Sequence, residues 1–410
     1  MTYDVDGTAA ESQAVDVAVV GAGQAGLSAG YQLRRDGVDF VMFDHAPRPG
    51  GAWQYRWPTL TLGKAHRIAD LPGMPLGTPD PARPASEVVS EYFGRYEREF
   101  GLGVRRPVDV SSVRGLPDGR LLLTTSEGDY AARYLINATG TWEKPFWPRY
   151  AGMETFRGRQ LHTHEYRGPD GFAGRRVVVV GGGASGVQAL LEIAGVAAET
   201  RWVTRRPPEW VEGPFDEELG RAAVAKVDER VRRGLPPGSV VSVTGLILTD
   251  EVRAARAAGV LHRLPMFERI TPSGVVWADG SSFEADVILW ATGFRASLGH
   301  LAPLGLRGPG GGIVMDGTRV AADPRVHLLG YGPSASTIGA NRAGRSAARA
   351  VRRALRGGAL EGQEGRDGRR GSAGEVRHTP GQTGRTATNP SDGRPEPPHR
   401  RQRGEITPAA

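Results

Sequence analysis

The chain has 410 residues, 39% of them hydrophobic, and a formal net charge of +7 at pH 7. This size suits one large or two packed globular domains, and no apolar run reaches the length of a membrane span, so we expect no membrane partner. Arginines scattered along the chain supply most of the positive charge. They form no clustered stripe or recognisable module, so we expect no nucleic-acid partner.

The N-terminal residues MTYDVDGTAAESQAVD are polar and acidic. They lack the basic region and apolar core of a secretory signal, so we expect a cytoplasmic protein. The sequence contains no cysteine, which excludes disulfide frameworks, thiolate metal sites and dithiol redox relays. Its nine histidines show no metal-ligand spacing, so we expect no metal.

The first predicted unit, after a loose arm, is the βαβ segment VDVAVVGAGQAGLSAGYQLRRDGVDFVMFD. It carries a G-x-G-x-x-G turn after a buried strand, and Asp44 stands at the end of the next strand. Such a turn brings backbone N–H groups and a helix N-terminus to a pyrophosphate, and the acid accepts hydrogen bonds from ribose hydroxyls. This pattern predicts a dinucleotide without a 2′-phosphate. The expected contacts in the turn are Gly21, Gly23, Gln24, Ala25 and Gly26.

The segment RPGGAWQYRWP follows this unit. Its paired glycines permit another close backbone approach, so we expect Gly51 and Trp53 to contact the same dinucleotide. The aromatic residues Trp53, Tyr55 and Trp57 either line a pocket or belong to the ordinary core, and the sequence leaves both readings open.

A second βαβ unit is predicted in RRVVVVGGGASGVQALLEIAGVAAETRWVTRR. No acid ends its second strand, where Arg205 and Arg206 stand instead. Arginine accommodates a 2′-phosphate, so this unit predicts an NADP(H) site, although surface arginines of an arginine-rich chain remain the alternative. The expected contacts in this turn are Gly181, Gly183, Ser185 and Gly186.

Two dinucleotide sites in one chain indicate hydride transfer from a nicotinamide to a tightly held flavin. We therefore expect FAD at the first turn and NADPH at the second.

Just before the second turn, Phe156, Gly158, His162 and Tyr166 fit the pattern F-x-G-x-x-x-H-x-x-x-Y. This pattern resembles the fingerprint of class B flavoprotein monooxygenases of the flavin-containing monooxygenase family. The related Baeyer–Villiger enzymes usually carry Trp at the position of Tyr166. The resemblance extends over residues 15–356.

Three further strings share the resemblance: INATG, LWATGF and GYGPSASTIGANRAGR. In the family such strings contact the cofactors or cross between domains. The residues that this implies here are Ala138, Thr139, Gly140, Ala291, Thr292, Gly293 and Tyr331. The last helix is expected to point its N-terminus, at residues 334–338, toward the flavin ring.

The sequence predicts an α/β fold of two Rossmann-like dinucleotide-binding domains, with the NADPH domain inserted in the FAD domain. Residues 14–155 and 286–356 are expected to form the discontinuous FAD-binding domain, and residues 156–285 the NADPH-binding domain with its linker. Residues 1–13 are expected to be a flexible arm. Residues 357–410 contain few apolar residues and are expected to be a disordered tail.

The resemblance implies an NADPH-dependent monooxygenase (EC 1.14.13.-), in which dioxygen forms a C4a-(hydro)peroxyflavin that oxygenates a small nitrogen or sulfur nucleophile. Many family members carry Asn where this chain has Gly63 and Lys64. This departure leaves open an NADPH dehydrogenase or oxidase that passes electrons to a quinone or to dioxygen. A non-catalytic redox-sensing module is a third reading. A small-molecule substrate and dioxygen are the expected partners, and a homodimer is compatible with the sequence.

Overall fold

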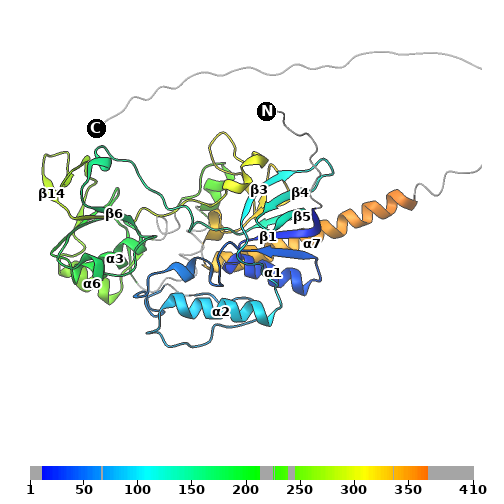
Figure 1. Ribbon diagram of the computed structural model, residues 1–410, viewed down its shortest axis with the longest axis horizontal. Coiled ribbons are helices and arrows are strands. Elements are labelled where there is room, and N and C mark those ends of the chain that lie inside the picture. Colours follow the sequence, from blue (N-terminus) through cyan, green and yellow to red (C-terminus); the bar gives the residue numbers. More distant parts are fainter. Residues whose placement is uncertain are drawn as a thin grey trace, which may run out of the picture. The chain divides into compact units, whose positions relative to one another are not determined.

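The computed structural model describes residues 12–65, 68–212, 225, 227–238, 245–335 and 337–367 (Figure 1). The expected arm lies outside these residues as far as residue 11, and the first strand begins at Gln13. The expected tail lies outside them from residue 368. Within the described residues, no helix combines the length and the apolar character that crossing a bilayer requires.

The first sheet has eight strands with the order β16-β17-β18-β5-β1-β2, and β4 and β3 continue antiparallel from β5. Its central strands β18, β5, β1 and β2 run parallel. The strands of this sheet are β1 (Gln13–Val20), β2 (Phe40–Phe43), β3 (Val110–Gly115), β4 (Leu121–Thr125), β5 (Gly128–Asn137), β16 (Met315–Asp316), β17 (Arg319–Val320) and β18 (Val326–Leu328).

The last four residues of β1 are buried on both faces of the sheet, to which alternate side chains of a strand point. Val17 and Val19 pack with the helices, whereas Ala18 and Val20 pack with β3, β4 and the residues after 298. Figure 1 shows α1 and α7 beside strands β1 and β5. The helical segments of this region are α1 (Gln24–Arg35), α2 (Ala85–Glu99), α7 (Thr337–Asp367) and the 3₁₀ turns η1 (Gly51–Tyr55), η4 (Gly299–Leu304) and η5 (Gly332–Ala335).

The second sheet has five parallel strands with the order β11-β8-β7-β15-β6. Its strands are β6 (Arg159–His162), β7 (Arg176–Val180), β8 (Glu199–Val203), β11 (Arg263–Leu264) and β15 (Val287–Trp290). Val177 and Val179 face α3, while Val178 and Val180 face a three-stranded antiparallel sheet. The remaining elements are β12 (Arg269–Thr271), β13 (Gly274–Val276), β14 (Ser282–Glu284), the pair β9 (Trp210–Val211) and β10 (Leu246–Ile247), helices α3 (Ala184–Ala194) and α6 (Asp250–Ala257), and the 3₁₀ turns η2 (Met153–Thr155) and η3 (Asp170–Phe172).

The α/β class is confirmed, but the chain returns to the first sheet later than expected. We placed the return at residue 286, which would put β15 in the first sheet. Instead β15 pairs in parallel with β7 and β6, and all four of its residues are buried between the two layers of the second region. The return to the first sheet therefore follows Trp290.

Helix α7 also extends beyond the expected boundary at residue 356, because it ends at Asp367. The added residues, 357–367, include Ala, Leu, Glu and Gln, which favour helices, but also four glycines, which disfavour them, so intrinsic propensity does not account for the extension. A low apolar content predicts that a segment buries little surface, but it does not prevent helix formation. The residue at which the expected flavin-facing N-terminus is centred, Ser336, lies outside the described part, as do the side chains of Thr337 and Ile338.

Two glycine turns and the segment that joins them

The first glycine turn is closed by the segment INATG. Gly21 has a φ of +97°, and a Cβ atom there would lie 2.5 Å from the carbonyl oxygen of Ala138. A Cβ atom on Gly26 would lie 1.9 Å from the carbonyl oxygen of Gly21. These glycines are therefore required by the contacts of the turn itself, where helix α1 crosses the end of β1.

Gly23 differs, because a Cβ atom there would meet only the Cα atom of Gly51, at 3.9 Å. Gly51 has a φ of +52° and approaches Gly23 closely, as expected for two segments of one site. Gly23 is the N-cap of α1 and has no side chain with which to cap the helix. An open cradle beneath an uncapped helix N-terminus fits a pyrophosphate.

The second turn repeats this construction with the segment WATG. Gly181 has a φ of +136°, and its Cβ atom would lie 2.2 Å from the carbonyl oxygen of Ala291. A Cβ atom on Gly186 would lie 3.0 Å from the Cβ atom of Ala291. Gly183 has nothing within 4 Å of a Cβ atom and is the uncapped N-cap of α3. The second turn therefore offers the same open cradle as the first.

The hydroxyls of the two Ala-Thr-Gly segments hold the neighbouring loops. Thr139 donates to the carbonyl oxygen of Ser297 at 2.6 Å, and Thr292 donates to the carbonyl oxygen of Phe146. The glycines that follow, Gly140 and Gly293, have φ values of +64° and +79°. Each Ala-Thr-Gly segment therefore changes direction sharply where it packs against the neighbouring glycine turn.

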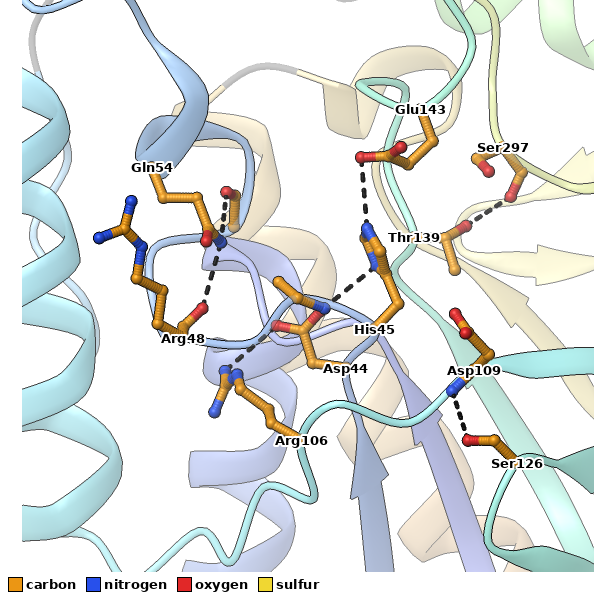
Figure 2. Close-up of polar contacts among 12 residues, drawn as sticks. Asp44, His45, Arg48, Gln54, Arg106, Asp109, Ser126, Thr139, Glu143 and Ser297 are labelled. Carbon is orange, nitrogen blue, oxygen red and sulfur yellow. Dashed lines mark hydrogen bonds and ion pairs between the residues drawn. The ribbon is translucent and has the colours of Figure 1, made fainter.

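Asp44 lies at the end of β2 and is 5% exposed. Its Oδ2 atom lies 3.2 Å from Nη2 of Arg106, and Oδ1 accepts from the backbone N–H of Ala46 (Figure 2). Arg106 also makes two hydrogen bonds to Glu97, at 2.7 and 2.8 Å. Burial raises the pKa of Glu97, while the hydrogen bonds from Arg106 oppose this shift. One buried guanidinium therefore holds two buried carboxylates.

His45 follows Asp44 and lies between two acids (Figure 2). Its Nε2 atom is 3.2 Å from Glu143, and its Nδ1 atom is 3.6 Å from Asp44. Gln54 donates from Nε2 to the carbonyl oxygens of Arg48 and Gly51, at 3.1 Å each. These contacts fix the loop that surrounds Asp44.

Arg205 and Arg206 are exposed at the end of β8. Before them, Thr204 is buried and donates to the carbonyl oxygen of Arg206 at 2.7 Å. Arg263 donates to the Thr204 hydroxyl and carbonyl oxygens, both at 3.0 Å, and so places a third guanidinium at this strand end. The strand end beside the second glycine turn therefore carries positive charges, whereas the strand end beside the first turn carries the negative charge of Asp44.

The fingerprint residues lie on or beside β6, which pairs with β15. Gly158 is needed because a Cβ atom there would lie 2.5 Å from both the ring of Phe156 and the carbonyl oxygen of Asp286. His162 is fully buried, and its Nδ1 atom accepts from the backbone N–H of His164 at 3.0 Å. These residues therefore fix the path of the chain into the second sheet.

Tyr166, the last fingerprint residue, contacts an acid on helix α3. Its hydroxyl donates to Glu192 at 2.8 Å, and the burial of Tyr166 raises its pKa. Glu192 also accepts from Nε1 of Trp57 at 3.2 Å and from the Thr59 hydroxyl at 2.7 Å. Trp57 is 1% exposed and packs against Tyr166, so it belongs to the core. Glu192 therefore joins the loop after η1, the fingerprint and α3. We call Glu192 and its three partners, Trp57, Thr59 and Tyr166, the Glu192 clamp.

Glu192→Ala is expected to destabilise the protein by about 1–3 kcal/mol, because it leaves the buried Tyr166 hydroxyl without a partner. Urea unfolding of the apoprotein measures this effect. Tyr166→Phe alone should cost less, and the double variant should show a loss smaller than the sum of the two. Strictly additive losses would mean that the two side chains are not coupled.

Two buried histidines, His162 and His327, and the partly buried His300 should make the protein sensitive to acid. Burial is the largest cause that lowers the pKa values of His162, His300 and His327 to about 4. In the unfolded chain a histidine titrates near 6.5, so between these values the unfolded state binds more protons. Stability is then fully present above pH 6.5 and is lost as the pH falls toward 4.

For His327, which is 2% exposed, the expected loss between pH 7 and pH 5 is about 2 kcal/mol. Urea unfolding at the two pH values, repeated with His327→Gln, isolates this contribution from that of other groups. The variant should lose less stability between the two pH values than the wild type. An equal loss in both proteins would contradict a depressed pKa at His327.

The other expected contacts occupy varied surroundings. Gln24 and Ala25 are buried in the first turn of α1, Trp53 and Ser185 are partly buried, and the hydroxyl of Tyr331 accepts from the Ile313 N–H at 3.0 Å.

Sequence reasoning missed Arg106, Glu97, Glu192 and Arg263, because no local motif marks them. No group of three or more acids and histidines in the described residues could hold a metal ion.

Comparisons with known proteins agree with this geometry. A family model for pyridine nucleotide-disulphide oxidoreductases matches residues 18–223. The structure of a flavin-containing monooxygenase from Stenotrophomonas maltophilia is 38% identical, with a TM-score of 0.72, and the match covers 84% of this chain and 99% of that one.

Two curated relatives are more distant. An uncharacterised CzcO-like oxidoreductase from Geobacillus kaustophilus is 28% identical, covering 68% of this chain and 80% of the relative. The indole-3-pyruvate monooxygenase YUCCA4 from Oryza sativa subsp. japonica is also 28% identical, covering 68% of this chain and 74% of the relative. With the fingerprint from Phe156 to Tyr166, these matches identify the family. The chain belongs to the class B flavoprotein monooxygenases of the flavin-containing monooxygenase type.

Proposed function

We propose that the chain is an NADPH-dependent FAD monooxygenase that oxygenates a small nitrogen or sulfur nucleophile. The observation that carries the proposal is the duplicated turn, with an open cradle at Gly23 and at Gly183 and opposite charges at the two strand ends. We assign FAD to the turn beside Asp44, and NADPH to the turn beside Arg205. Each turn with its parallel sheet then forms one dinucleotide-binding domain.

The flavin, when bound, supplies the redox chemistry and the activation of dioxygen. The chain's own residues bind and orient the two cofactors. Asp44, held in place by Arg106, would accept hydrogen bonds from ribose hydroxyls of FAD. Arg205 and Arg206 would attract the 2′-phosphate of NADPH. The Glu192 clamp would keep the two turns in register.

The proposal is tested with the purified flavoprotein, NADPH and a panel of thioethers and tertiary amines under ¹⁸O₂. We expect the product to gain one labelled oxygen atom per NADPH consumed, apart from NADPH lost to peroxide. Release of hydrogen peroxide without a labelled product, for every compound in the panel, would favour an NADPH oxidase instead. Efficient electron transfer to a quinone alone would favour the dehydrogenase reading left open by Gly63 and Lys64.

Arg205→Ala is expected to raise the KM for NADPH by about 10- to 100-fold, because a charge-assisted contact to the 2′-phosphate is lost. The KM for NADH should change little, because NADH lacks that phosphate. Anaerobic flavin reduction with each nucleotide measures both values. Faster reduction of the wild type by NADH than by NADPH would contradict the role given to Arg205.

A further inference from the structure

Arg56 is the residue that follows η1, and its guanidinium lies among aromatic rings. Its Cζ atom is 4.9 Å from the ring centroid of Trp142 and 5.8 Å from that of Trp53. No carboxylate within the described part of the chain forms an ion pair with it, and its side chain makes no hydrogen bond there. Arginines that are largely enclosed are normally paired, so this one requires an explanation.

The guanidinium of Arg56 is enclosed by the protein but is not fully buried. Protein atoms surround the guanidinium and burial lowers its pKa to about 10, yet part of the residue's surface remains accessible. The charge is retained at neutral pH. A side chain that is enclosed but still partly accessible is not sealed in the core, so a ligand can reach it.

The location of Arg56 connects it to the first turn. Segment η1 begins at Gly51, whose Cβ atom would lie 2.8 Å from the Cα atom of Gly23. Trp142 lies two residues after Gly140 in the sequence. Its ring stacks on those of Tyr55 and Phe294, with distances between ring centroids of 6.0 and 5.1 Å. Arg56 therefore stands beside the carboxyl ends of β1 and β5, where the proposed FAD site lies.

We propose that Arg56 provides the positive charge that binds an anionic group of the bound flavin dinucleotide, either its diphosphate or the reduced ring. This inference rests on the proposed function. An unpaired enclosed cation costs stability in the protein without its ligand, and an anion beside the guanidinium would remove that cost. The aromatic rings hold the guanidinium in place but do not neutralise it.

The test compares Arg56→Met with Arg56→Lys and with Arg256→Gln. Arg256 is a matched control, since its Cζ atom also lies 4.9 Å from a tryptophan ring, that of Trp210, but Arg256 is exposed and far along the chain from the first turn. Three quantities are measured: the thermal midpoint of the apoprotein, the Kd of oxidised FAD, and the midpoint potential of bound FAD.

We expect apo Arg56→Met to be at least as stable as the wild type, and its FAD binding to be weaker by tenfold or more in at least one redox state. Selective weakening of the reduced state by tenfold lowers the potential by about 30 mV and assigns the charge to the reduced ring. Equal weakening of FAD binding in both redox states leaves the potential unchanged and would mean that the Arg56 charge binds the diphosphate. Arg56→Lys keeps the positive charge and should show only part of each loss. Arg256→Gln should show no loss.

Apo Arg56→Met that is less stable than the wild type, with unchanged FAD binding and potential, would overturn the inference and leave Arg56 a structural partner of the two tryptophans. A loss confined to NADPH affinity would also overturn it. Failure of the wild-type protein to bind FAD would refute the proposed function itself, so the two failures are distinguishable.

Discussion

Arg106→Met is expected to cost about 3–5 kcal/mol of unfolding free energy, because it strands two buried carboxylates. The exposed fractions of the side chains of Arg106, Asp44 and Glu97 are 10%, 5% and 10%. Methionine fills a similar volume without charge, so the expected loss is electrostatic and not a packing defect. Urea unfolding of the apoprotein measures it, and the variant should also purify without flavin, because Asp44 loses its support.

Two comparisons separate this effect from others. Adding Glu97→Gln to Arg106→Met removes one stranded charge and should recover part of the lost stability. Arg83→Met removes an exposed guanidinium that contacts Glu91 at 2.6 Å, and should cost much less than Arg106→Met, because solvent screens an exposed ion pair. Equal costs for the Arg83 and Arg106 variants would show that burial does not strengthen the Arg106 contacts.

Much of the local structure could be predicted from the sequence. The two glycine turns, their flanking strands and helices, and Asp44 at a strand end all follow from short patterns, in which each residue's role is set by its close neighbours. The equivalence of the two Ala-Thr-Gly segments was suggested by resemblance alone. The structure supplies its physical basis, since Ala138 closes over Gly21 as Ala291 closes over Gly181.

What the sequence did not predict depends on contacts between distant residues. Arg106 and Asp44 are 62 positions apart, and Glu192 and Trp57 are 135 positions apart. No periodicity links such pairs. The misplaced β15 has the same origin, because a short buried strand such as VILW fits either parallel sheet. Only its pairing with β6 and β7 decides the matter.

The glycines of the two turns divide into two kinds, and alanine substitutions should distinguish them. Gly26→Ala would place a Cβ atom 1.9 Å from backbone oxygen and is expected to unfold the turn, with loss of both stability and flavin. Gly23→Ala and Gly183→Ala meet no atom closer than 3.9 Å and have ordinary negative φ values of −77° and −95°. Their apoproteins should therefore be as stable as the wild type.

If the cradles hold the cofactors, each methyl group occupies space that a diphosphate needs. Gly23→Ala should then weaken FAD binding, and Gly183→Ala should raise the KM for NADPH while the protein keeps its flavin. Each effect should reach at least about tenfold, or about 1.4 kcal/mol. Titration of the apoproteins with FAD, and anaerobic reduction of the flavin by NADPH, measure them separately. Wild-type affinities in both variants would mean that the open space at these glycines serves no cofactor, and exchanged effects would reverse the assignment of the two turns.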